Sequence, residues 1–187
     1  MRPGKPSQHK SQRRDAARDT HAGKENVPSQ EWVYESKSVT DTLRLGQAIG
    51  RQVRGGDVVA LYGDLGTGKT TFVRGMATGV GAKPRAVTSP TFVLIHEYRG
   101  RLLLAHADLY RLESLNDIRH LGMEDYFNEH TAVAVEWADR GSIHLPPDRL
   151  DVRLSHAHRD ARSIRMQAGG PLSRRLLAAA TAGFLGA

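Results

Sequence analysis

Residues 63–71 read Gly63-Asp64-Leu65-Gly66-Thr67-Gly68-Lys69-Thr70-Thr71, which fills the phosphate-binding pattern of Gly, any four residues, Gly, Lys and Ser or Thr. Glycines in such a loop let successive backbone N–H groups turn toward a β-phosphate. The pattern places Lys69 to reach the β and γ oxygens and the Thr70 hydroxyl to ligate Mg²⁺. The stretch therefore predicts a binding site for a nucleoside triphosphate.

The residues on either side of this loop supply the context that the pattern needs. Residues 57–62 form a short apolar run typical of a buried strand, and residues 72–79 suit a helix that opens at Gly68. The alternative is a chance match, which background residue usage allows in about one chain in a hundred of this length. The strand, loop and helix in this order favour the nucleotide site.

Apolar runs and helical patterns alternate along the rest of the chain. We expect a helix over 40–53, a hairpin of strands over 92–98 and 101–107, helical segments over 115–121 and 123–127, a buried strand over 131–135, and a closing hairpin over 150–154 and 163–166. Strands separated by helices around a phosphate loop predict a three-layer α/β domain of the P-loop NTPase type. In this domain antiparallel strands extend a parallel core.

The 187-residue chain is expected to form one domain, with a segment of different composition on either side of it. Residues 1–30 hold seven Lys or Arg against three acidic residues, so they supply +4 of the formal net charge of +7. Because they contain almost no large apolar side chain, we expect a disordered basic leader, either simply solvated or in contact with RNA. Residues 31–168 are the expected nucleotide-binding domain, and residues 169–187 a tail or short helix.

Two features of the sequence bear on cysteine chemistry and on insertion into a membrane. The chain has no cysteine, which excludes disulfides, Cys-zinc sites and thiol catalysis. Its longest apolar candidate, residues 176–187, is too short to span a bilayer. We therefore expect a protein without a membrane or disulfide partner, most simply in a bacterial cytoplasm.

Two carboxylates follow apolar strands, where ligands bind in open α/β sheets. Glu136 ends the run 133–135 and is predicted to bind Mg²⁺, with a solvent-facing side chain as the alternative. Asp108 ends the run 102–107 and could bind a metal or orient a water, or only cap a helix that opens at residues 108–111. From the sequence alone, His106 is interpreted as a packed or hydrogen-bonded strand residue.

Four motifs in order resemble the bacterial TsaE ATPases of the tRNA threonylcarbamoyladenosine pathway. They are residues 63–71, Thr88-Ser89-Pro90-Thr91-Phe92, His106-Ala107-Asp108-Leu109-Tyr110-Arg111 and Val135-Glu136-Trp137. The resemblance covers residues 35–168. It implies slow ATP hydrolysis that supports, rather than performs, threonylcarbamoyl transfer to adenosine 37 of tRNA. The implied partner is a TsaB–TsaD pair, contacted through TsaD, so that tRNA is reached indirectly.

The resemblance also implies roles for individual residues. Phosphates would be bound by Gly66, Thr67, Gly68, Lys69, Thr70 and Thr71, and Mg²⁺ by Thr70 and Glu136. Lys69 and Asp108 would assist catalysis together with Thr91, which belongs to a switch loop. Trp137 would lie near the nucleotide, and Ser38 and Arg162 match segments near the adenine. The chain departs from the family pattern at Thr67, where alanine is frequent, and in its basic leader.

Other functions remain open at the level of sequence. Asp108 could deprotonate a substrate hydroxyl in a small-molecule kinase, although no long arginine-bearing lid segment follows it. ATP could also gate a binding module in which hydrolysis is incidental. A GTPase is disfavoured because no Asn-Lys-x-Asp sequence occurs. A pI near 10.0 would suit a nucleic-acid binder with salt-dependent affinity. Arg111 and Arg140 are the candidates for a catalytic arginine.

Overall fold

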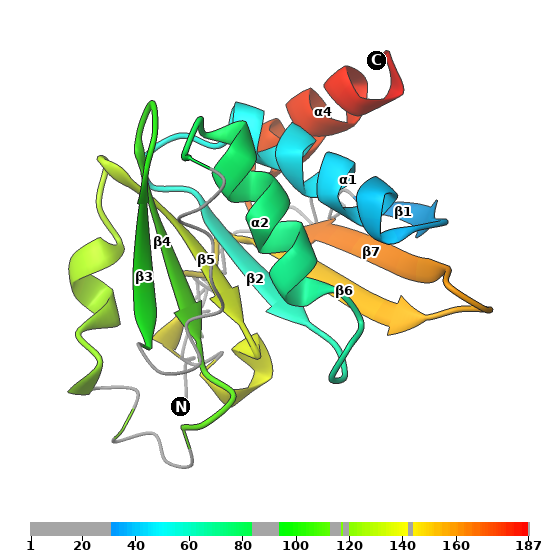
Figure 1. Cartoon of the computed structure of the whole chain (residues 1–187). Helices are drawn as coiled ribbons and strands as arrows, with labels where there is room; N and C mark the ends of the chain where they lie inside the picture. Colours follow the sequence, from blue (N-terminus) through cyan, green and yellow to red (C-terminus); the bar gives the residue numbers. More distant parts are fainter. Residues whose placement is uncertain (1–30, 84–93, 113–116, 118–119, 142–143, 187) are drawn as a thin grey trace, which may run out of the picture.

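A computed structural model describes residues 31–83, 94–112, 117, 120–141 and 144–186 (Figure 1). The strands are β1 (Glu31–Ser36), β2 (Val58–Tyr62), β3 (Ile95–Arg99), β4 (Leu103–Asp108), β5 (Thr131–Glu136), β6 (Leu150–His156) and β7 (Arg162–Ala168). The helices are α1 (Val39–Gln52), α2 (Lys69–Gly79) and α4 (Pro171–Leu185), with the short 3₁₀ turns η2 (Met123–Tyr126) and η3 (Ala138–Arg140).

Within this described part the strands form one seven-stranded sheet in the order β1-β7-β6-β2-β5-β4-β3. The four central strands, β6, β2, β5 and β4, run parallel to one another. β3 pairs antiparallel with β4, β7 pairs antiparallel with β6, and β1 pairs antiparallel with β7 at the edge of the sheet. Every residue of β2 and of β5 is buried, as expected for parallel strands covered on both faces. The mixed α/β sheet predicted from the sequence is confirmed.

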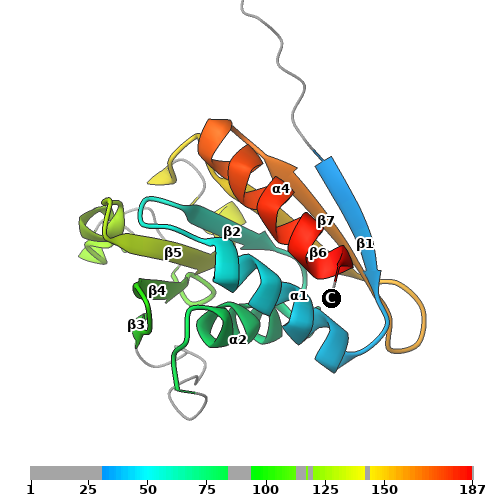
Figure 2. The ribbon, with the colours of Figure 1, turned by 90° about the horizontal axis from the view of Figure 1, so that it is seen from above.

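Helices α1, α2 and α4 lie on the same face of the sheet (Figures 1 and 2). Their apolar side chains bury a core with Val59 and Leu61 of β2. Glycines bring α1 and α2 unusually close: a Cβ on Gly46 would lie 2.1 Å from the carbonyl oxygen of Phe72, and one on Gly75 would lie 2.2 Å from that of Leu43. This contact fixes α2, and with it the loop before it, against the rest of the domain.

The opposite face of the sheet is covered by shorter segments. Val133 and Val135 of β5 pack there with Leu109, Met123 and Leu145, in a second buried cluster. The predicted helix over residues 115–121 lies largely outside the described residues. No helix among the described residues is long and apolar enough to cross a membrane.

Strand β1 was not predicted as an element. It pairs with β7 at one edge of the sheet, and its Trp32 and Tyr34 rings pack with Phe184 of α4. Its partners lie more than 120 residues away in the chain, so sequence patterns near β1 do not show what stabilises it. The alternation of Trp32 and Tyr34 with polar residues was nevertheless a readable strand signal.

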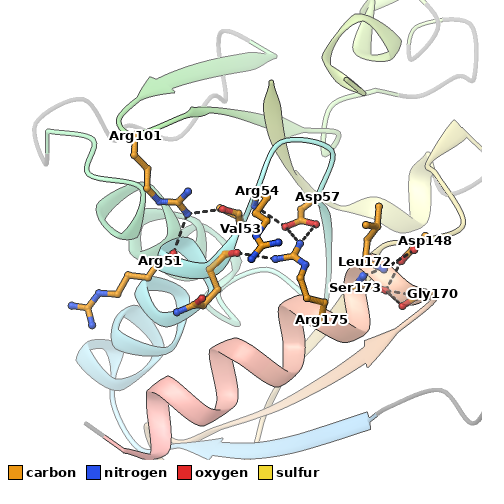
Figure 3. Close-up of polar contacts among 11 residues, drawn as sticks. Arg51, Val53, Arg54, Asp57, Arg101, Asp148, Gly170, Leu172, Ser173 and Arg175 are labelled. Atoms are coloured by element: carbon orange, nitrogen blue, oxygen red, sulfur yellow. Dashed lines mark hydrogen bonds and ion pairs between the residues drawn. The ribbon is translucent and has the colours of Figure 1, made fainter. Parts of the chain in front are cut away.

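The segment expected to be a tail or short helix contains α4, which packs against α1 and buries Leu176 and Leu177. Asp148 holds the start of α4 by accepting hydrogen bonds from the backbone of Leu172 and Ser173 (Figure 3). Arg175 of α4 donates to both carboxylate oxygens of Asp57 at 2.6 Å. Because the Asp57 side chain is only 2% exposed, this pair ties α4 to the start of β2.

Replacing Arg175 with Met should lower the free energy of unfolding by about 2 kcal/mol, because it leaves a buried carboxylate without its cation. The Arg175 side chain is 28% exposed, so we expect less than the loss seen for fully buried pairs. Denaturant unfolding measures the difference. The control is Arg165→Met, which breaks an exposed pair with Glu31 and should cost under about 1 kcal/mol. Equal losses of unfolding free energy in the two variants would contradict a stabilising role for the pair of Arg175 and Asp57.

Candidate nucleotide-binding site

The predicted site residues meet at the carboxyl ends of three neighbouring parallel strands. β2 runs into the loop 63–68, while β4 ends at Asp108 and β5 at Glu136, at the same edge of the sheet (Figure 1). Asp108 and Glu136 are direct neighbours in the register of β4 and β5. Open α/β sheets place their ligands at this edge.

A cavity of about 310 Å³ opens between these elements. Its lining consists of Leu65, Gly66, Gly68, Lys69, Thr70, Thr71, Asp108, Tyr110, Glu136 and Trp137. Eight of these ten residues were predicted as site residues from the sequence; Leu65 and Tyr110 were not.

The loop has the backbone conformation that its glycines were predicted to permit. Gly63, Gly66 and Gly68 have φ angles of 135°, 79° and 105°, which side-chain-bearing residues rarely adopt. Gly68 precedes the first turn of α2, so the free N–H groups of the helix start face the cavity side of the loop. Thr67 is buried within the loop, where its hydroxyl donates to the carbonyl of Asp64 at 2.9 Å.

The ammonium group of Lys69 lies at the cavity, although the residue is only 4% exposed. Its Nζ donates to the carbonyl oxygens of Gly63 and Asp64 at 2.6 and 2.9 Å and lies 3.8 Å from the centre of the Trp137 ring. Burial lowers the pKa of Lys69, and the negative charges of Glu136 and Asp108 oppose that shift. The lysine thus sits among groups that favour its charged form.

Glu136 is held by two hydrogen bonds, one on each carboxylate oxygen. The Thr70 hydroxyl donates to Oε2 at 2.9 Å, and Nε2 of His106 lies 2.8 Å from Oε1. The side chain of Glu136 is 3% exposed and that of His106 is fully buried. The predicted metal residues, Thr70 and Glu136, are therefore in contact. The hydrogen-bonded interpretation of His106 is confirmed, but its partner was not foreseen.

Two oxygen donors at this spacing suit a hard cation such as Mg²⁺, which is commonly bound by one or two protein oxygens plus substrate phosphates. Among the described residues no group of three or more His, Cys, Asp or Glu side chains forms a metal cluster on its own. A metal at Thr70 and Glu136 would thus depend on phosphate oxygens to complete its ligands.

Asp108 makes a capping contact and also lies at the cavity, so its role toward a metal or a water stays a prediction. Its Oδ1 accepts a hydrogen bond from the backbone N–H of Tyr110 at 3.0 Å, which is the local capping contact. Its side chain also lines the cavity. Burial raises the pKa of Asp108, while the hydrogen bond from Tyr110 lowers it and the charge of Glu136 raises it further.

An aromatic wall closes one side of the cavity. The rings of Tyr110 and Trp137 lie 4.8 Å apart, and the Arg140 guanidinium lies 5.4 and 6.0 Å from their centres. Trp137 has φ 56°, a left-handed conformation that costs a non-glycine residue about 1–2 kcal/mol. Sequence reasoning missed Tyr110 as part of this wall because the turn at Trp137 carries no local signal.

The remaining predicted residues lie at the margin of the cavity or outside the described residues. Ser38 caps α1 by accepting a hydrogen bond from the N–H of Asp41. Arg162 lies beside the loop, with its Nε 3.4 Å from the point that a Cβ on Gly68 would occupy. Neither residue lines the cavity, so their roles toward adenine stay predictions. Thr91 and the rest of residues 84–93 lie outside the described residues.

Comparison with known proteins gives consistent matches. The profile of the family described as threonylcarbamoyl adenosine biosynthesis protein TsaE matches residues 36–164. A tRNA threonylcarbamoyladenosine biosynthesis protein TsaE of Treponema pallidum is 41% identical over 119 residues, which cover 64% of this chain and 87% of that protein. The protein of the same name from Bacillus subtilis is 45% identical over 116 residues, covering 62% and 72% of the two chains.

A solved structure is also similar. The crystal structure of Bacillus subtilis YdiB superimposes with a TM-score of 0.71 and 31% sequence identity, and covers 83% of this chain and 97% of that chain. The family profile begins at the end of β1 and stops within β7, so the phosphate loop, Asp108 and Glu136 all fall inside the matched region.

Proposed function

The chain belongs to the TsaE family of threonylcarbamoyl adenosine biosynthesis proteins, and we propose that it serves this pathway as a Mg²⁺-dependent ATP hydrolase. In this proposal hydrolysis supports the transfer of threonylcarbamoyl to adenosine 37 of tRNA, and a TsaB–TsaD pair performs the transfer. The assignment to the pathway rests on the family, and the activity rests on the geometry of the cavity.

One observation carries the proposal. The Lys69 ammonium, the Thr70 hydroxyl and the Glu136 carboxylate all line a single cavity beside a glycine loop and the start of α2. The loop N–H groups and Lys69 supply positive charge for phosphate oxygens. Thr70 and Glu136 supply the oxygen ligands for Mg²⁺, which when bound would neutralise charge on the phosphates.

Besides ATP and the groups named above, hydrolysis requires a positioned water molecule. In hydrolysis the water oxygen forms a bond to the γ-phosphorus, and the bond from that phosphorus to the bridging oxygen breaks, so that ADP leaves with the electron pair. The water gives up one proton, so the products are ADP, inorganic phosphate and a proton. Asp108 lines the same cavity and can accept a hydrogen bond from this water through its carboxylate. Lys69 and the loop stabilise charge on the phosphate oxygens during the step.

Exposed apolar side chains at the cavity favour the binding of a protein partner there. Two residues that line the cavity are also exposed: Leu65 of the loop is 73% exposed, and Tyr110 is 41% exposed. Exposed large apolar groups beside a functional cavity are typical of docking surfaces. A partner seated there, which we propose to be the TsaD subunit, would also exclude water from the phosphates.

Phosphate release and nucleotide binding test the proposal together. We expect Mg²⁺-dependent release of inorganic phosphate from ATP, and calorimetric affinity for ATP that weakens in EDTA. Phosphate appearing on an added nucleoside or sugar in place of free phosphate would favour the kinase interpretation. Tight binding of ATP without any release, with or without the partner pair, would favour the gated binding module.

Replacing Asp108 with Asn should reduce the rate of hydrolysis by about 10²-fold while leaving ATP affinity within about threefold, as for removal of a group that acts in the transition state. Asparagine keeps an oxygen that can accept the hydrogen bond from the N–H of Tyr110, so the local turn is preserved. Single-turnover kinetics measure the rate. A variant that hydrolyses ATP as fast as the unchanged protein would reduce Asp108 to a capping residue.

A further inference from the structure

We propose that His106 is a positioning residue that holds the Glu136 carboxylate in the orientation needed to bind Mg²⁺ beside the nucleotide. The inference rests on the proposed function, because it assumes that Glu136 is a metal ligand. His106 itself touches neither the cavity nor, by this account, the nucleotide. It is a buried polar residue for which the sequence analysis found no functional role.

The position of His106 follows from the pairing of β4 and β5. His106 lies opposite Ala134, two residues before Glu136, so it sits one row deeper in the sheet on the neighbouring strand. Ala134 is small and leaves space for the imidazole to reach across. The result is the 2.8 Å contact between Nε2 of His106 and Oε1 of Glu136, with both side chains almost completely removed from water.

A second contact allows the His106 imidazole to carry its proton on Nε2. The Tyr98 hydroxyl lies 3.4 Å from Nδ1 of His106, and Tyr98 is 1% exposed. Burial, followed by the charge of Glu136, raises the pKa of Tyr98 to about 12, so the phenol keeps its proton at neutral pH. When Tyr98 donates to Nδ1, the neutral imidazole carries its proton on Nε2 and donates it to Glu136.

The two carboxylate oxygens of Glu136 therefore have different partners. The deep oxygen, Oε1, is fixed by His106, and Oε2 faces Thr70 at the cavity. Hydrogen bonds to a metal-binding side chain from the layer behind it orient that ligand, and their loss typically costs about 10–100-fold in metal affinity. Without His106, Oε1 would be a buried acceptor lacking its donor, and the carboxylate would be free to turn.

The test compares variants of His106 that keep or lose the donor at the Nε2 position. Glutamine has an amide N–H that can reach that position, whereas leucine has no donor and asparagine is too short. The control is Leu104→Val, two residues earlier on the same buried face of β4, which perturbs packing without touching Glu136. Thermal unfolding of all four variants establishes that each is folded.

Two measurements on the full chain separate positioning from general damage. Calorimetry with ADP gives nucleotide affinity in EDTA and in Mg²⁺, and electron paramagnetic resonance gives the affinity of Mn²⁺ for the protein–ADP complex. For His106→Leu and His106→Asn we expect Mn²⁺ affinity about 10–100-fold weaker and ADP affinity in EDTA within about twofold. His106→Gln should recover most of the metal affinity, and Leu104→Val should leave it unchanged.

The unchanged protein and the variants answer different questions. If the unchanged protein binds ADP without any linkage to Mn²⁺ or Mg²⁺, the proposed function fails, and this inference fails with it. If that linkage is present, the role of His106 is overturned by variants with unaltered Mn²⁺ affinity, by equal losses of ADP affinity with and without metal, or by a matching loss in Leu104→Val. Should the leucine variant not fold, asparagine against glutamine decides the result.

Discussion

Replacing Lys69 with Ala is expected to lower the rate of ATP hydrolysis by about 10²–10³-fold, the size of effect found when one charged or polar group is withdrawn from a developing negative charge. The Lys69 ammonium is held 2.6 Å from the carbonyl of Gly63 and 3.8 Å from the Trp137 ring, so it is fixed in the cavity before a phosphate arrives. Among the residues that the structure describes, no other lysine lines the cavity.

Steady-state release of phosphate with Mg²⁺ measures this effect, and calorimetry of ATP binding shows how much of it is lost affinity. The matched control is Lys83→Ala, an exposed lysine beyond the opposite end of α2, which should leave both quantities unchanged. Thermal unfolding should show that both variants are folded. Hydrolysis by Lys69→Ala at the rate of the unchanged protein would rule out the phosphate role assigned to this residue.

Replacing Glu136 with Gln is expected to abolish the tightening of ATP binding by Mg²⁺ and to lower hydrolysis by about 10²–10³-fold. The amide has the size of the carboxylate but no charge, and it cannot accept hydrogen bonds at both ends. Thr70 and His106 both contact Glu136, so one of these two partners loses its acceptor. In EDTA, nucleotide affinity should be equal or slightly higher, because a negative charge near the phosphates has been removed.

Calorimetry in Mg²⁺ and in EDTA separates these contributions. Glu35→Gln, an exposed carboxylate on β1, is the control for loss of one negative charge and should behave as the unchanged protein. If Glu136→Gln retains the full effect of Mg²⁺ on ATP binding, the metal is held elsewhere. Asp108 would then be the next carboxylate to test, since it also lines the cavity.

The parts of the site that lie in one continuous stretch could be predicted from the sequence. The loop 63–71 fixes its own conformation through Gly63, Gly66 and Gly68, whose positive φ angles are a property of glycine itself. Asp108 and Glu136 could be placed because each ends an apolar strand, and parallel strands end at the same edge of a sheet. Their adjacency depends only on β4 and β5 being neighbours.

Other features depend on contacts that no local pattern encodes. His106 reaches Glu136 because β4 and β5 are aligned so that Ala134 lies opposite the imidazole. The wall of Tyr110 and Trp137 depends on a left-handed turn at a tryptophan, which sequence preferences disfavour. Strand β1 and helix α4 stabilise one another through Trp32, Tyr34 and Phe184, from opposite ends of the described chain.

Contacts that stabilise the fold were also missed where they join distant parts of the chain. The bond between Arg175 and Asp57 joins residues 118 positions apart and was not predicted, although both side chains are strong ion-pair formers. Likewise, the close packing of α1 on α2 depends on Gly46 facing the backbone of Phe72. Composition identifies such residues, but only the tertiary arrangement shows which of them meet.

The central claim is that ATP hydrolysis at this cavity sustains tRNA threonylcarbamoylation. The most direct measurement follows hydrolysis and tRNA modification in one tube over many turnovers, with the cognate TsaB–TsaD pair and Mg²⁺, using ATP or a slowly hydrolysed analogue. We predict that the pair accelerates hydrolysis and that modification continues past the first turnover only with ATP. Hydrolysis unaffected by the pair, with modification equally complete when this protein is omitted, would contradict the account.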